Sequence, residues 1–149
     1  MATIFDYVFK NKQKLSGVTA VLVYPMNALI NSQEEEIMKY EINYLNSFLP
    51  EIERKKYDPS IEENKSIPVA QLLEAVRSVS SIEFPVRYSK YTGQENDEAR
   101  ERAKNEKPHI ILTNYMMLEL IMTREKETWM RELMKNDLRY LVFDEVHTY

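Results

Sequence analysis

Two adjacent carboxylates, Asp144 and Glu145, follow a short apolar run near the end of the chain, and His147 comes two residues later. Acidic side chains at the end of a strand can hold a divalent cation beside a nucleotide phosphate and activate a water molecule. In such a site Asp144 would bind Mg²⁺, and Glu145 would orient and deprotonate the attacking water. His147 would sense the nucleotide or couple the site to another domain. The pattern predicts part of a nucleoside triphosphatase site.

Three other interpretations of these residues remain open. An acidic pair at a strand-to-loop junction, followed by a solvated histidine, needs no chemistry. A mononuclear metal site formed by Asp144, Glu145 and His147 is a second alternative, although adjacent side chains of an extended chain point to opposite faces. A metal-dependent nuclease would need further carboxylates at other strand ends, and the sequence offers no convincing ones.

The sequence lacks the glycine-rich loop that cradles nucleotide phosphates. The only glycines are Gly17 and Gly93, and no GxxxxGK(S/T) pattern occurs. Such loops depend on glycine because their backbone must approach the phosphates closely. We therefore expect these 149 residues alone neither to hydrolyse ATP nor to unwind a duplex.

Length and composition indicate a single globular domain. The chain has 149 residues, of which 44% are hydrophobic and 30% charged, so it can bury a core. The absence of cysteine excludes disulfides and thiolate metal sites. No apolar stretch approaches the roughly 18 residues of a membrane span, and Asp6 and Lys10 interrupt the N-terminal segment, so it is no secretory signal. We expect a soluble, cytoplasmic protein without a membrane partner.

Hydrophobic periodicity predicts strands that alternate with helices. The predicted strands span residues 18–24, 84–88, 109–112 and 140–143. The predicted helices span residues 3–14, 27–48, 71–79, 96–107, 116–124 and 128–135, with Gly17 ending the first helical unit. Residues 50–68 hold three prolines and a mixed charge run, which indicates an excursion or loop rather than a domain boundary. The alternation predicts an α/β fold, a parallel sheet with helices on both faces.

Three polar motifs each follow a predicted strand. They are Pro25-Met26-Asn27, Thr113-Asn114 and Asp144-Glu145. Ligand sites of open parallel sheets lie beyond the carboxyl ends of the strands. We therefore expect the three motifs to meet at one edge of the sheet. Thr113 also has an ordinary alternative role, as the N-cap of the helix after it.

Four segments, in order, resemble the first RecA-like motor domain of superfamily 2 DEAD/DEAH-box helicases, especially bacterial DNA helicase-like proteins with a "YPMNAL" motif. The segments cover about half of the chain: AVLVYPMNALINSQ (20–33), YTGQENDEARER (91–102), PHIILTNYMMLELIMTR (108–124) and LRYLVFDEVHTY (138–149). The sequence departs from the family at Asn31-Ser32, where alanine-aspartate or a similar pair is usual. The resemblance implies a partial RecA-like fold.

The resemblance also implies roles for individual residues. Asp144 and Glu145 would form a Walker B (DExH) pair that binds Mg²⁺ and ATP in the parent protein, with His147 beside them. The residues expected to contact nucleic acid are Pro25, Asn27, Ala28, Thr92, Gly93, Thr113 and Asn114. Short hydroxyls, amides and helix N-termini suit contacts to the sugar-phosphate backbone.

Two functional hypotheses follow. In the first, residues 1–149 are a partial helicase ATP-binding domain that starts after the phosphate-binding loop and ends just after motif II. The parent would be an ATP-dependent helicase or translocase whose partners are nucleic acid, with DNA favoured, and a second RecA-like domain. In the second, the chain is a degenerate, non-catalytic motor domain that binds nucleic acid or a protein.

Overall fold

The computed structural model of the chain describes residues 2–11 and 17–144. The chain divides into two compact units. The first, here called the sheet unit, comprises Met1–Ile30 and Pro85–Tyr149, and the second, the helical unit, comprises Asn31–Phe84. The helical unit is thus inserted between two strands of the sheet unit.

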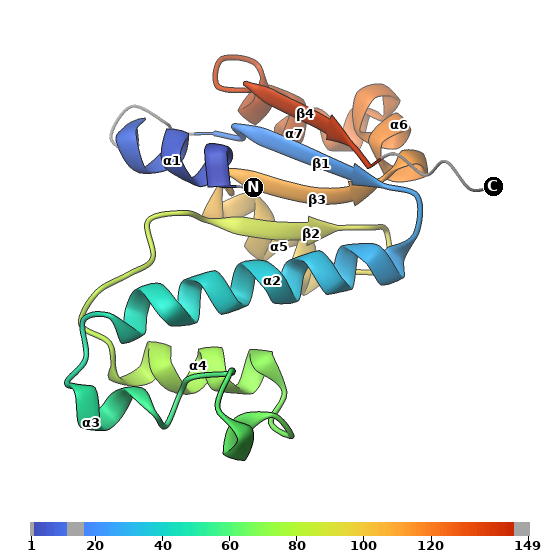
Figure 1. Cartoon of the computed structure of the whole chain (residues 1–149). Helices are drawn as coiled ribbons and strands as arrows, with labels where there is room; N and C mark the ends of the chain where they lie inside the picture. Colours follow the sequence, from blue (N-terminus) through green and yellow to red (C-terminus); the bar gives the residue numbers. More distant parts are fainter. Residues whose placement is uncertain (1, 12–16, 145–149) are drawn as a thin grey trace. The chain divides into compact units, whose positions relative to one another are not determined.

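The sheet unit is built on a parallel sheet. Its strands in the described residues are β1 (Ala20–Tyr24), β2 (Tyr88–Tyr91), β3 (Ile110–Asn114) and β4 (Tyr140–Phe143), in the order β2-β3-β1-β4 (Figure 1). Every neighbouring pair is parallel. The α/β fold with an all-parallel sheet, expected from the sequence, is confirmed.

The strand register places all carboxyl ends at one edge of the sheet. Tyr24 of β1 pairs with Asn114 of β3, and Val23 pairs with both Thr113 and Phe143. Tyr91, the last residue of β2, also pairs with Thr113. The segments that follow neighbouring strands therefore begin about one strand spacing, roughly 5 Å, apart.

One face of the sheet packs against two helices. Val21, Val23 and Ile111 belong to a core cluster with residues of α6 (Tyr115–Thr123) and α7 (Thr128–Met134). The helix residues of this cluster are Met117, Ile121, Met130 and Met134. Burying each such side chain contributes roughly 1.5–3 kcal/mol. In Figure 1 α7 passes behind the strands, as does α5 (Asp97–Glu106).

β1 and β3 are almost uniformly apolar because they are the inner strands. Their sequences, AVLVY and IILTN, are buried along nearly their whole length. A strand that is covered on both faces cannot alternate apolar and polar residues. The outer strand β4 differs, since Leu141, Val142 and Phe143 are each nearly half exposed.

The helical unit has a core of its own. It contains most of α2 (Asn27–Asn46), followed by α3 (Glu51–Arg54), a 3₁₀ turn (Glu62–Asn64) and α4 (Val69–Val79). Its buried apolar residues are Ile42, Leu45, Leu72, Leu73 and Val76. Arg77 also clamps the buried Glu41 with two hydrogen bonds of 2.6 and 2.8 Å. The excursion expected at residues 50–68 therefore contains short helices and is part of a packed unit.

The predicted strand at residues 84–88 is wrong, because β2 spans Tyr88–Tyr91. Pro85 has no backbone N–H to donate to a ladder, so the apolar run FPVRY cannot pair along its length. β2 pairs only with β3 among the described strands, and an edge strand can be as polar as YSKY. The helix expected at 3–14 is α1 (Ala2–Asn11), and residues 12–14 lie outside the described part of the chain.

Gly17 is needed for close packing against α7. A Cβ atom at this position would lie 2.2 Å from the carbonyl oxygen of Leu133. The next residue, Val18, donates its N–H to the same oxygen at 2.9 Å. Only glycine lets the segment before β1 lie this close to the end of α7.

No helix within the described residues is both long and apolar enough to cross a membrane.

Candidate nucleic-acid interface

Asn114 connects the motifs that follow β1, β2 and β3. Its side-chain Nδ2 donates to Asn27 Oδ1 at 2.9 Å and to the carbonyl oxygen of Thr92 at 3.2 Å. Its Oδ1 accepts from Met117 N at 2.7 Å and thereby caps α6. Three segments that are far apart in the sequence are thus joined through one side chain, on the carboxyl edge of the sheet.

Thr113 has a different environment from its neighbour. Its side chain is fully buried, and its hydroxyl donates to the carbonyl oxygen of Tyr91 at 2.7 Å. The alternative that Thr113 caps the following helix is wrong, because Asn114 is the N-cap. Thr113 ties β3 to β2 and has no exposed side-chain surface for a nucleic-acid strand.

Pro25 and Ala28 lie where β1 turns into α2, and both are accessible. Pro25 is half-buried and Ala28 is exposed. The turn closes when Leu29 N and Ile30 N donate to the carbonyl oxygen of Met26, at 3.1 and 3.4 Å. The helix starts directly at the sheet edge, which directs its first backbone N–H groups toward that edge.

Thr92 and Gly93 form a tight turn that is held by Glu95. The Glu95 carboxylate accepts from Thr92 N at 2.6 Å, from Thr92 Oγ1 at 2.5 Å and from Gly93 N at 3.2 Å. Gly93 has a φ of 90°, a conformation that side chains disfavour. Sequence reasoning missed Glu95, although the T-x-x-E spacing is the pattern of a capping box and could have revealed it.

An exposed aromatic pair borders the same edge. The rings of Tyr115 and Phe143 are stacked with centroids 5.9 Å apart, and each residue is 46% exposed. The Tyr115 hydroxyl also donates to the carbonyl oxygen of Asp144 at 3.2 Å. Exposed rings of this kind can stack on nucleobases. The pair could not be predicted from the sequence, in which only the position of Tyr115 directly after the TN element pointed to this edge.

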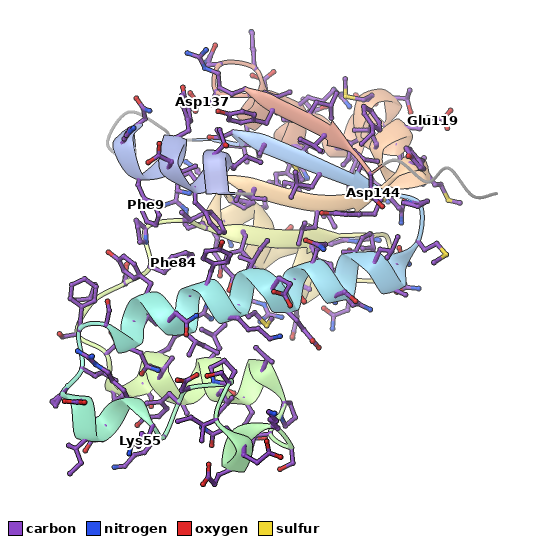
Figure 2. The ribbon with its side chains drawn as sticks, in the orientation of Figure 1. Phe9, Lys55, Phe84, Glu119, Asp137 and Asp144 are labelled. Atoms are coloured by element: carbon purple, nitrogen blue, oxygen red, sulfur yellow. The ribbon has the colours of Figure 1, made fainter. Side chains whose placement is uncertain are left out.

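Asp144 lies at the carboxyl end of β4, as Figure 2 shows. Its backbone N–H donates to the carbonyl oxygen of Val23 at 2.8 Å, which fixes it beside β1. Burial, and secondly the negative charge of Asp144, raise the pKa of Tyr24 above its usual value. Glu145 and His147 lie outside the described residues, so their expected roles stay predictions.

Within the described residues, a magnesium site at this edge would depend on Asp144. Residues 2–11 and 17–144 contain no cluster of three or more His, Cys, Asp or Glu side chains that could hold a metal ion. Mg²⁺ nevertheless suits this position, because it keeps several waters and binds through one or two carboxylates plus substrate phosphates. The half-buried Asp144 fits such a role.

Comparison with known proteins identifies the family. Residues 67–149, more than half of the chain, match the family model described as DEAD/DEAH box helicase. The chain belongs to the DEAD/DEAH box helicase family. No curated protein matches the sequence. Members of this helicase family generally use ATP and Mg²⁺, which agrees with the chemistry that Asp144 can supply.

A solved structure gives the same fold. The chain is similar to the DUF1998 helicase MrfA, whose crystal structure contains bound DNA, with a TM-score of 0.55 and 19% sequence identity. The match covers 98% of this chain but 14% of the MrfA chain. At this identity the similarity supports the partial RecA-like fold of the DEAD/DEAH box chain and no finer assignment.

Proposed function

We propose that this chain is part of an ATP-dependent nucleic-acid helicase or translocase and holds one strand at the carboxyl edge of its sheet. The observation that carries the proposal is the Asn114 bridge, which joins the segments of Asn27 and Thr92 in a member of a helicase family. A surface built by three separate strand ends can contact a ligand that extends along the sheet edge. A nucleic-acid strand has that shape.

The chemistry of the interface favours the backbone of the strand over its bases. α2, α5 and α6 begin after β1, β2 and β3 respectively, and helix N-termini attract phosphate. Asn27 and Gly93 offer short polar or backbone groups, which bind phosphate and sugar without reading sequence. The buried Thr113 acts as a positioning residue in this proposal. DNA is favoured over RNA because the similar MrfA structure contains DNA.

Hydrolysis belongs to the parent protein in this proposal. Asp144 would hold Mg²⁺, Glu145 would activate water and His147 would couple the site to a second RecA-like domain. ATP bound there would supply the free energy for movement along the strand. The chain alone should not hydrolyse ATP, because its sequence contains no phosphate-binding loop.

Strand binding is tested with a fluorescent single-stranded oligonucleotide and anisotropy at low salt. The wild-type chain should bind, with an affinity that falls as salt rises. Asn27→Ala should weaken binding about fivefold, in line with the ~1 kcal/mol of a hydrogen bond. Asn43→Ala, an exposed position in the same helix α2, is the matched control and should leave the affinity unchanged. No binding by the wild type, or equal effects of both variants, would contradict the interface.

The encoding locus provides a test of the motor hypothesis. A GxxxxGK(S/T) sequence upstream and a second motor domain downstream would support the helicase parent. Their absence would favour the alternative, a degenerate motor domain that binds nucleic acid or a protein without hydrolysing ATP. The same oligonucleotide in DNA and RNA form would show which nucleic acid the interface prefers.

A further inference from the structure

The turn at Thr92 and Gly93 already contains an anion. The Glu95 carboxylate accepts three hydrogen bonds from this turn. The donors are Thr92 N at 2.6 Å, Gly93 N at 3.2 Å and the Thr92 hydroxyl at 2.5 Å. Thr92 is 9% exposed, so its hydroxyl has little access to other partners. These three donors could bind a phosphate, but all three are occupied by the Glu95 carboxylate.

This donor set suits a phosphate as well as a carboxylate. Consecutive backbone N–H groups that point into one concavity form an anion site, and charge-assisted hydrogen bonds to it are short. The two hydrogen bonds from Thr92 to Glu95 are this short, at 2.6 and 2.5 Å, while that from Gly93 N is longer, at 3.2 Å. A phosphodiester oxygen pair could accept the same three hydrogen bonds.

Arg100 adds a positive charge beside the turn. One guanidinium nitrogen of Arg100 donates to the carbonyl oxygen of Gly93 at 3.4 Å. Its Nε atom is buried and has no hydrogen-bond partner in the structure. Because no hydrogen bond among the described residues of this turn joins Arg100 to Glu95, the positive charge of Arg100 lies beside the turn whether or not the carboxylate occupies it.

We propose that Glu95 occupies a phosphate-binding site and that a nucleic-acid strand must displace its carboxylate to bind Thr92 and Gly93. The inference rests on the proposed function, since it assumes that a strand follows this edge of the sheet. Glu95 then lowers the affinity for every strand by the free energy of its own contacts. It also restricts binding to ligands that supply a competing anion at this point.

The ordinary alternative is that Glu95 is a structural staple. The T-x-x-E spacing occurs in capping boxes, where the acidic side chain only satisfies backbone N–H groups. A staple predicts that its removal destabilises the turn and leaves strand affinity unchanged or weaker. The displacement proposal predicts a higher affinity. The two hypotheses thus differ in the sign of one measurable quantity.

The test compares Glu95→Gln with Glu98→Gln in the anisotropy experiment. Both variants remove one negative charge, and Glu98 is exposed on the first turn of α5, so overall electrostatics are matched. Glu95→Gln should bind single-stranded DNA about five times more tightly than Glu98→Gln, because the binding-competent state becomes more populated.

Glu95→Ala serves as the second variant and removes the acceptor entirely. Amide resonances of Thr92 and Gly93, followed by NMR, should shift when the oligonucleotide is added to Glu95→Ala. They should shift less in the wild type at the same concentration. Circular dichroism establishes that each variant is folded.

Two negative outcomes are distinguishable. If the wild type binds and Glu95→Gln matches Glu98→Gln in affinity, the displacement proposal is wrong while strand binding stands. If neither the wild type nor any variant binds a strand, and the two amides do not shift, the proposed function and the displacement proposal both fail.

Discussion

Asn114 uses both ends of its side-chain amide inside the protein. Its Oδ1 caps α6, while its Nδ2 reaches Asn27 and the carbonyl oxygen of Thr92. The expectation that Asn114 binds the strand directly is untested. Its hydrogen bonds hold the neighbouring segments of Asn27 and Thr92 in place. Residues of this type set the shape of an interface without contributing much surface to it.

Replacement of Asn114 by Asp separates its two roles. Aspartate is a good N-cap, so α6 keeps its capping hydrogen bond, but both donated hydrogen bonds are lost. We expect strand affinity to fall at least as much as in Asn27→Ala. Asn114→Ala should lower the free energy of unfolding by about 1.5–3 kcal/mol, measured by urea denaturation.

Asn96→Ala is the control for stability, because Asn96 caps α5 with a single hydrogen bond to Ala99 N. The Asn96→Ala substitution should lower the free energy of unfolding by about 1 kcal/mol. If Asn114→Ala lowers the free energy of unfolding no more than Asn96→Ala does, the hydrogen bonds to Asn27 and Thr92 contribute nothing to stability.

His109 makes stability depend on pH. It is 1% exposed, and its Nδ1 accepts from Arg87 N at 2.9 Å, which assigns the proton to Nε2. Nε2 is buried without a hydrogen-bond partner. Burial, and secondly the charge of Arg87, lower the pKa of His109 to about 4, with Asp137 acting in the opposite direction. Protonation in the folded state would break the hydrogen bond from Arg87.

The lowered pKa of His109 means that the free energy of unfolding decreases as the pH falls. Above pH 6.5 His109 is neutral in both states, and as the pH falls from 6.5 to about 4 the unfolded state binds the proton first. We expect the free energy of unfolding to fall by up to about 3 kcal/mol over this pH range. His109→Asn keeps an acceptor near Nδ1 but does not titrate, so urea denaturation at pH 7 and pH 4.5 should show a smaller loss for it. Parallel curves for the two proteins would exclude His109 as the cause.

At the scale of elements, the two glycines are needed for different reasons, Gly17 for space and Gly93 for its positive φ. Gly17→Ala would place a Cβ against the backbone of Leu133, which cannot move without shifting α7. Gly93→Ala meets only the flexible Met117 side chain at 3.6 Å, but at a φ of 90°. We expect Gly17→Ala to lower the free energy of unfolding by about 3 kcal/mol or more, and Gly93→Ala to lower it by about 1–2 kcal/mol. Thermal denaturation should therefore give the lower Tm for Gly17→Ala, and the reverse order would contradict the packing argument.

The elements that the sequence predicted well are those with strong periodicity. β1, β3 and β4, together with α2, α4, α5, α6 and α7, lie within about two residues of their predicted positions. β2 was misplaced because an edge strand needs little apolar content and a proline-containing run beside it is more hydrophobic. α3 was missed because four residues are too few to show a helical period.

The candidate site was predictable only in part. Sequence position placed Asn27, Thr92 and Asn114 at strand ends, and parallel pairing brings such ends together. The sequence could not show that Thr113 is buried, because burial depends on side-chain direction, whereas the T-x-x-E spacing could have revealed the contact of Glu95 with the turn. The stacking of Tyr115 on Phe143 joins residues 28 positions apart and depends on the strand order.

At the scale of the whole molecule, the helical unit has a separate core, and this predicts local unfolding. Leu73→Ala removes a buried side chain from the cluster of Ile42, Leu45 and Val76. We expect a cost of about 2–5 kcal/mol, with faster amide hydrogen exchange in α4 and the later part of α2. Amides of β1 and β3 should keep their protection. Uniform loss of protection would show that the two units unfold together.

Ile121→Ala, in the cluster beneath β1 and β3, is the matched substitution in the sheet unit. It should raise exchange in β1, β3 and α6 and leave α4 protected.

The strand order also sets a delay during protein synthesis. β1 is the inner strand that pairs with both β3 and β4, and its first partner, Ile110, follows Ala20 by 90 residues. At roughly 5–20 residues per second, a ribosome needs about 5–18 s to make that partner. The apolar segment AVLVY must wait unpaired for this time. Newly made chains should therefore depend on chaperones that shield β1 until β3 leaves the ribosome.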